Sequence, residues 1–217
     1  MPIVYHALRM AWTAAELRIL KKLSTPARVQ DFLDAMPFNI VDDNDTCMSP
    51  RLVLQNRRAQ CMEGAMFAAA ALRVHGFPPL VVDLTATHDD ADHVIAVFQV
   101  DGCWGAISKT NHAVLRYREP VYTTLRELVM SYFHEYFLQS NRMKTLRGFS
   151  RPVNLSRFDT RSWETSEEPS WYIPEYLCEI THTPILTKRQ IARLRKADAM
   201  EMQAGAIVEW KTAPEAP

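Results

Sequence analysis

Hydrophobic residues recur at helical spacing at the start of the chain. Thr13 and Glu16 form a capping-box pattern ahead of an apolar stripe, which predicts a first helix. Thr25 followed by Pro26 predicts a second helix start, because proline is favoured in the first helical turn. Apolar residues then share one face of this helix as far as the proline at position 37, namely Val29, Phe32, Leu33 and Met36.

Residues 61–75 form the strongest helical segment of the chain. The segment is rich in Ala, Leu and Met, which have high helix propensity. Gly76 follows at the position of a C-terminal cap, and Pro78 and Pro79 prevent the helix from continuing. Because apolar residues occur on most sides, we expect this helix to lie buried at the centre of the domain.

Three β-rich runs follow this helix, at residues 80–84, 93–100 and 103–107. Asp101-Gly102 between the last two runs is a strong signal for a tight hairpin turn. The order of one central helix and then at least three strands predicts an α+β fold, with the helix packed on an antiparallel sheet and further helices flanking it.

The remaining segments are less regular. Residues 39–50 are polar and acidic and predict a solvated loop, since the run at positions 42–45 lacks the ligand spacing of a calcium loop. Residues 122–137 read as a helix with a capping box at Thr124 and Glu127. A stretch rich in proline and tryptophan spans 151–184, and a last helix starts at Thr187 and carries Ile191, Leu194 and Met200.

The length of 217 residues suits one well-buried domain. With 6 glycines and no long flexible linker, we expect a single domain over 1–217. It comprises N-terminal helices and a loop (1–57), a core motif (58–112), and C-terminal helices with an aromatic-rich segment (113–217).

Charge and composition exclude several classes of protein. The chain has 25 Lys and Arg and 25 Asp and Glu, so it lacks the basic field that holds nucleic acid or anionic lipid. No run approaches the roughly 18 apolar residues of a membrane span, and the N-terminus does not resemble a secretion signal. These features predict a cytoplasmic protein with no nucleic-acid or membrane partner, and they leave the oligomeric state open.

The four cysteines, Cys47, Cys61, Cys103 and Cys178, are irregularly spaced and form no CxxC pair, as expected of free thiols. We expect no metal and no cofactor. A zinc site drawn from Cys47, Cys61, His75 and His93 lacks the paired ligand spacing of structural zinc sites.

Cys61 is the candidate nucleophile. It stands at the N-terminus of the predicted central helix, where unsatisfied N–H groups and the helix dipole favour an anion and hence the reactive thiolate. Glu63 opposes this effect locally, so a base is needed. His93 opens a predicted strand after the loop 85–92, and a helix-start cysteine and a strand-start histidine can meet where the helix packs on the sheet. Taken alone, each residue has a simple structural explanation, as a buried cysteine or a solvated histidine.

Residues 58–110, about a quarter of the chain, resemble the transglutaminase-like superfamily of papain-like cysteine proteins. Members show a cysteine that opens an alanine-rich helix, which ends in Leu-Arg-x-x-Gly-apolar-Pro before a strand. The matching residues here are Cys61, Glu63, Ala65, Leu72, Arg73, Gly76, Phe77 and Pro78. A histidine, a glycine turn, a tryptophan and, four residues later, an aspartate follow in the family. This chain has His93, Asp101-Gly102 and Trp104, and it has Ser108 where the family has the aspartate.

The resemblance implies a papain-like core and a mechanism. The Cys61 thiolate would attack an amide or ester carbonyl to give a thioester, with His93 handling the proton. Ser108 would occupy the orienting position of the triad, with Asn111 or Asp83 as support. The backbone N–H of Cys61 would stabilise the oxyanion, together with the side chain of Gln55 or Gln60.

The expected function is therefore a cysteine enzyme that acts on a peptide or another amide, with hydrolysis favoured over crosslinking. Because Ser108 replaces the acid, a second hypothesis stays open. In that hypothesis the chain is a catalytically silent transglutaminase-like fold that binds a protein partner, and its aromatic-rich C-terminal third covers a groove or contacts that partner.

Overall fold

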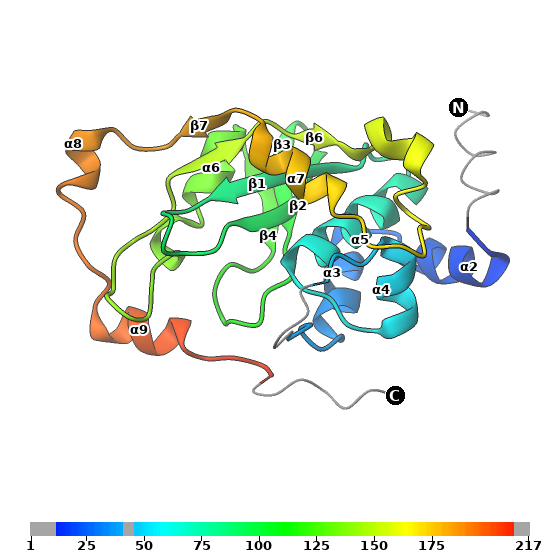
Figure 1. The fold of residues 1–217 in the computed structure, drawn as a ribbon, viewed down its shortest axis with the longest axis horizontal. Coiled ribbons are helices and arrows are strands. Elements are labelled where there is room, and N and C mark those ends of the chain that lie inside the picture. Colours follow the sequence, from blue (N-terminus) through cyan, green and yellow to red (C-terminus); the bar gives the residue numbers. More distant parts are fainter. Residues whose placement is uncertain (1–11, 41–45, 211–217) are drawn as a thin grey trace.

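The computed structural model describes residues 12–40 and 46–210. The acidic run at positions 42–45 lies outside the described residues. The described part is an α+β fold built on a seven-stranded antiparallel sheet, with strand order β4-β3-β2-β1-β5-β7 and with β6 paired to β1 beside β5. The helices α2–α5 gather beside one end of the sheet, and α8 and α9 lie near the other end (Figure 1).

The N-terminal helices form where capping residues predict them. Helix α2 (Ala14–Lys22) begins with a complete capping box between Thr13 and Glu16. Helix α3 (Pro26–Asp34) is capped by the Thr25 side chain, with proline in its first turn. A third helix, α4 (Pro50–Asn56), is capped by Ser49 and was not predicted. All three helices pack on α5.

Helix α5 (Cys61–Val74) is the central helix, as predicted, and it packs chiefly on β2. Twelve of its fourteen residues are buried, including Glu63 and Gly64. An apolar helix of this kind is stable only when other elements surround it, because burying apolar surface is the main source of its stability. The sheet covers one side of it, and α2, α3 and α4 cover others.

The three predicted strands form as β1 (Leu80–Thr85), β2 (His93–Val100) and β3 (Cys103–Ile107). They are joined in order as an antiparallel meander. Asp101 and Gly102 both have positive φ, at 50° and 80°, which is the backbone of the hairpin turn expected for this dipeptide.

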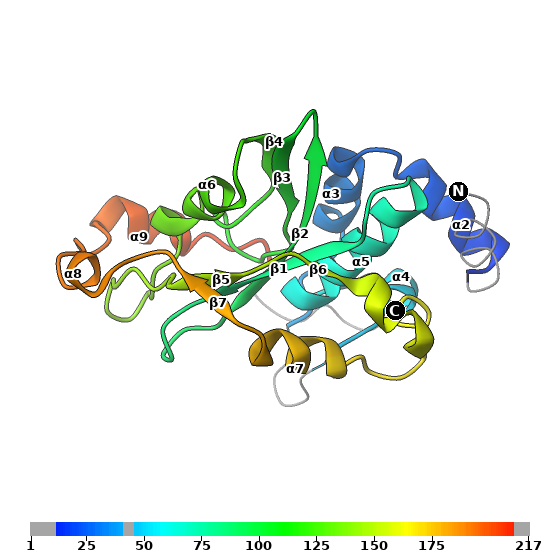
Figure 2. The ribbon, with the colours of Figure 1, turned by 90° about the horizontal axis from the view of Figure 1, so that it is seen from above.

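The two faces of the sheet belong to two hydrophobic clusters. Val94, Ala96 and Phe98 of β2 join α5 in the first cluster, whereas Ile95 and Val97 belong to the second. Helix α7 (Tyr172–Glu179) contributes to the first cluster and α6 (Leu125–Met130) to the second, so these helices lie on opposite sides of the sheet (Figure 2).

The prediction of one helix over 122–137 is wrong in its bounds. Tyr122 is the last residue of β4 (Arg118–Tyr122), because its backbone pairs with β3. Helix α6 is capped by Thr124 as expected but ends at Met130, and a 3-10 turn, η1 (Phe133–Glu135), follows it.

The prediction of one last helix from Thr187 to beyond Met200 is also wrong. Helix α8 (Lys188–Ile191) has the expected capping box, but α9 (Ala199–Gly205) is a separate helix capped by Asp198. The backbone N–H of Ala197 donates to Arg142 O at 2.9 Å, and this contact diverts the chain between the two helices.

The stretch 151–184 folds onto the edge of the sheet. It contains β6 (Val153–Asn154), the 3-10 helix η2 (Leu155–Arg161), α7 and β7 (His182–Pro184), and it follows β5 (Gly148–Ser150). Trp163 in this stretch is fully buried against the N-terminal part of the core. None of the described helices has the length and apolar character that crossing a lipid bilayer would take.

Candidate functional site

Cys61 is the first residue of α5 and is half-buried. The backbone N–H groups of Met62 and Val94 hydrogen-bond to its sulfur, and the Oε1 atom of Gln60 lies 4.0 Å from it. The thiol therefore sits where the start of the helix meets the start of β2. This is the position that the sequence predicts for an activated cysteine.

A glycine in the first turn of α5 allows the start of this helix to lie close to the sheet. A Cβ atom on Gly64 would lie only 2.5 Å from Cβ of Lys109, which lies two residues beyond the end of β3. Any side chain at position 64 would push the helix start away from the sheet. Gly64 thus allows the N-terminus of α5 to pack against the start of β2 and the segment that follows β3.

His93 is 7% exposed and opens β2. Side chains alternate along a strand, so its ring leaves β2 on the face of Ile95 and Val97, opposite the face on which α5 packs. The ring Nε2 lies 2.7 Å from the Ser108 hydroxyl, on the extension of the neighbouring strand. Ser108 thus contacts the ring of the candidate base, and it is the residue predicted from the sequence for the orienting position.

The hydroxyl of Ser108 also selects the tautomer of His93. It donates its single proton to Leu115 O at 2.5 Å, so it can only accept from the ring. Nε2 of His93 therefore carries the proton, and Nδ1 keeps an unprotonated lone pair. A base needs such a lone pair to remove a proton from a thiol.

Burial keeps both the thiol and the imidazole neutral. It raises the pKa of Cys61 above the ordinary 9.0, although the two N–H groups at the sulfur oppose the effect. Burial also lowers the pKa of His93 to about 4. At neutral pH the resting site is thus a thiol beside a neutral imidazole, rather than a thiolate beside an imidazolium.

Cys61 and His93 line one cavity of about 390 Å³ at this end of the sheet. The hydrogen bonds found for the described residues do not include one between the thiol and the ring. Tyr136 also lines the cavity, and its hydroxyl donates to Ala91 O at 2.5 Å. This bond fastens the loop before His93 to the segment after α6.

Cys61 also borders a second, smaller cavity of about 190 Å³ beneath α7. Asp83 and Asp92 line this cavity, together with Cys47 and Cys178. Cys61 thus borders both cavities. His93 lines only the larger one, Asp83 lines only the smaller one, and Asp92 lines both.

Asp83 is hydrogen-bonded to His182 rather than to His93. Its Oδ2 atom pairs with Nε2 of His182, on β7, at 2.9 Å. Burial and the nearby charge of Asp92 raise the pKa of Asp83 to about 6, and the contact with His182 opposes that rise. The carboxylate also raises the pKa of Cys61, so in the resting state it disfavours the thiolate.

The three amides named from the sequence have different surroundings. Gln55 is exposed on α4 and lies outside the residues that line the two cavities at Cys61. Gln60 adjoins the thiol, and its Nε2 donates to Thr46 O at 2.6 Å. Asn111 lines the larger cavity, but its amide bonds the backbone N–H and C=O of Trp210 near the C-terminus.

Two residues beside the site, Gln30 and Tyr136, were missed, and the structural role of a third, Glu63, was not recognised. Gln30, on α3, bonds both backbone groups of Ser108. Tyr136 fastens the loop before His93. Glu63, read only as a charge that opposes the thiolate, is fully buried and anchors the start of α5. The four donors to its carboxylate are Asn39 Nδ2, Thr46 Oγ1, Met48 N and Gln60 N.

Only the role of Glu63 had a signal in the sequence, since an acid at the third helical position often bonds the backbone of the residue before the helix. Among residues 12–40 and 46–210, no three His, Cys, Asp or Glu side chains converge closely enough to hold a metal ion. Neither a protein-family model nor a curated protein matches this chain.

Proposed function

We propose that this chain is a cysteine enzyme of transglutaminase-like type, which acts on an amide or peptide bond and transfers the acyl group to water. Cys61 is the nucleophile, His93 the general base and Ser108 the orienting residue. The papain-like character of the core is part of the same proposal.

One observation carries the proposal. The Ser108 hydroxyl, by donating to Leu115 O, leaves His93 with its proton on Nε2 and its lone pair on Nδ1. The thiol of Cys61 borders the same cavity as this ring. A serine can thus supply the orientation and tautomer that an acid supplies elsewhere, although it adds no charge to stabilise an imidazolium.

The reaction begins from the neutral pair. As the Cys61 sulfur attacks the substrate carbonyl carbon, its proton passes to Nδ1 of His93, and the oxygen becomes an oxyanion. The backbone N–H of Cys61, at the start of α5, is available as a donor to that oxygen. The imidazolium then protonates the leaving amine, which leaves a thioester that water hydrolyses with His93 as base.

The test uses p-nitrophenyl acetate, an activated ester, as the acyl donor. Cys178 is exposed and competes for reagents, so the reference protein carries Cys178→Ser. We expect a burst of p-nitrophenolate and an acetyl group on Cys61, located by mass spectrometry. In His93→Ala the burst rate should fall by about 10²- to 10⁴-fold, as expected for loss of a general base.

The matched control is Cys103→Ser, which removes a half-buried thiol outside the two cavities at Cys61. It should leave the burst unchanged. Acetylation that is equally fast without His93, or that falls on Cys47 or Cys103 instead of Cys61, would overturn the enzyme proposal.

A second candidate function has its own support. The raised pKa of Cys61, the low pKa of His93 and the lack of a thiol–imidazole hydrogen bond among the described residues favour a silent site in a protein-binding module. In that case Cys61→Ala should keep the fold and the binding of a partner, and no acetyl group should form on Cys61 in the reference protein.

A further inference from the structure

Ser108 lies one residue beyond the end of β3, so the sheet does not hold its backbone. A side chain from another part of the chain takes this role. Oε1 of Gln30 accepts from the Ser108 N–H at 3.0 Å, and Nε2 of Gln30 donates to the Ser108 C=O at 2.9 Å. The amide thus bonds both backbone groups of Ser108, as the backbone of a neighbouring strand would.

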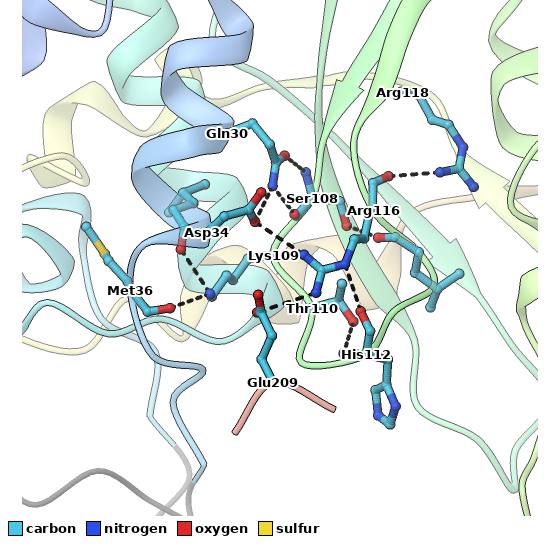
Figure 3. A network of polar contacts seen from close by, with 12 residues as sticks. Gln30, Asp34, Met36, Ser108, Lys109, Thr110, His112, Arg116, Arg118 and Glu209 are labelled. Atoms are coloured by element: carbon cyan, nitrogen blue, oxygen red, sulfur yellow. Dashed lines mark hydrogen bonds and ion pairs between the residues drawn. The ribbon is translucent and has the colours of Figure 1, made fainter. Parts of the chain in front are cut away.

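Gln30 is itself held firmly. It lies on α3, is 5% exposed, and its Nε2 atom also donates to Asp34 Oδ1 at 2.8 Å. Figure 3 shows the side chain reaching from α3 to the backbone of Ser108. A buried glutamine with both amide atoms bonded has one orientation available, because turning it over would place donors against donors.

Lys109, the next residue, is also hydrogen-bonded to the α3 region. Nζ of Lys109 donates to Leu33 O at 2.9 Å and to Met36 O at 2.6 Å, at the C-terminal end of that helix (Figure 3). A cation at this end of a helix is favoured by the helix dipole and by the unpaired carbonyls there. Ser108 and Lys109 therefore move together with α3.

We propose that Gln30 is a positioning residue of the Cys61–His93 site. It fixes the backbone of Ser108, and thereby the hydroxyl that keeps the proton of His93 on Nε2. The inference rests on the proposed function, and it adds that α3, far from the core motif in sequence, is part of the site. Gln30 itself contacts neither Cys61 nor His93 through a hydrogen bond found for the described residues.

The test compares Gln30→Leu with Val29→Ala. Leucine keeps the approximate volume of glutamine but offers no hydrogen bond to Ser108. Val29 is a neighbouring, fully buried residue of the same helix that packs in the hydrophobic core, so its truncation weakens α3 without touching Ser108. If Gln30→Leu does not fold, Gln30→Asn replaces it, because the asparagine side chain is one methylene too short to bond both backbone groups of Ser108.

The first measurement is the tautomer of His93, read from ring ¹⁵N shifts and assigned with a His93→Gln variant. The wild type and Val29→Ala should show protonated Nε2 and bare Nδ1. Gln30→Leu should show the two nitrogens averaged, because the Ser108 hydroxyl is no longer held. This measurement needs no turnover, so it remains decisive even if the enzyme proposal fails.

The second measurement is the rate of Cys61 acetylation. Gln30→Leu should lower it by about 10- to 100-fold, as expected for a misplaced catalytic group, whereas Val29→Ala should keep it within about twofold. If Gln30→Leu changes neither the tautomer nor the rate, or if Val29→Ala changes both equally, Gln30 does not position the site. A wild type that is not acetylated on Cys61 refutes the proposed function instead.

Discussion

His93 Nε2 and Ser108 Oγ lie 2.7 Å apart, and the hydroxyl proton points away from the ring, to Leu115 O. A serine can therefore hold an imidazole in a single tautomer provided that its own proton has another acceptor. Ser108 differs energetically from an acid at the same position because it carries no charge. Since Ser108 carries none, and since burial disfavours the protonated ring, His93 stays neutral at neutral pH.

Replacing Ser108 with alanine should slow acetylation of Cys61. The variant leaves the buried Nε2–H of His93 without its acceptor and removes the preference for one tautomer. We expect a loss of between about 10- and 10⁴-fold, the larger value being that for loss of the orienting acid in a serine protease. Burst kinetics with p-nitrophenyl acetate measure the loss.

Ser108→Asp tests the same position by adding a carboxylate instead of removing the hydroxyl. A carboxylate at this place would stabilise the imidazolium, so it should raise the pKa of His93 and increase thiol reactivity. The matched control, Ser156→Asp, adds the same charge at a half-buried position of η2, outside the two cavities at Cys61. If Ser108→Asp folds but leaves reactivity unchanged, Ser108 does not occupy the orienting position.

The pH dependence of acetylation should follow the low pKa of His93. Only the neutral ring accepts the thiol proton, so the rate should fall on the acid side with a midpoint near pH 4, the pKa of the buried imidazole. The raised pKa of Cys61 places any alkaline rise above pH 9. A rate profile from pH 3.5 to 9 measures this, and an acid midpoint near 6.5 would contradict the low pKa of the buried His93 ring.

Asp83→Asn should stabilise the protein as the pH rises. The folded-state pKa of Asp83, about 6, lies above its ordinary value of 3.8, so its contribution is fully present below pH 4 and is lost as the pH rises through 6. Asparagine does not ionise, so the variant does not lose stability in this way as the pH rises. Its Oδ1 atom can still accept a hydrogen bond from His182. The stability difference between variant and wild type should therefore grow between pH 4 and pH 7, by on the order of 3 kcal/mol.

Urea unfolding at several pH values measures that difference. Asp89→Asn, a substitution of an exposed carboxylate in the loop before β2, is the control and should show little growth. A constant difference between Asp83→Asn and wild type across this range would show that Asp83 ionises normally in the folded protein.

Glu63→Gln should destabilise the fold. Four donors converge on the buried carboxylate, and an amide nitrogen at this place would face some of them. Hydrogen bonds to a buried charged group are worth about 1.5–3 kcal/mol each, and we expect a net loss of about 3 kcal/mol. Glu179→Gln, at an exposed position of α7, should stay within about 0.5 kcal/mol in the same unfolding experiment.

Local signals were enough to predict much of the fold. Capping residues locate the starts of α2 and α3, and the Asp101-Gly102 turn sets the register of β2 and β3. The strands β5, β6 and β7 have two or three residues each and carry no such signal. They form because their backbones pair with β1 or with each other, which is a property of the assembled sheet.

Local sequence patterns were sufficient to predict that Cys61 starts a buried helix, that His93 starts a strand and that Ser108 follows the next strand. Those facts depend on propensity, capping and alternation, which act over a few residues. How these residues are paired and charged depends on contacts that form only in the folded chain. Gln30 reaches Ser108 across 78 positions of sequence, and Asp83 turns to His182 rather than to His93. Pairing of this kind joins residues far apart in sequence, so local patterns do not reveal it. The protonation of the thiol and the imidazole depends on burial, and burial is a property of the whole packed core.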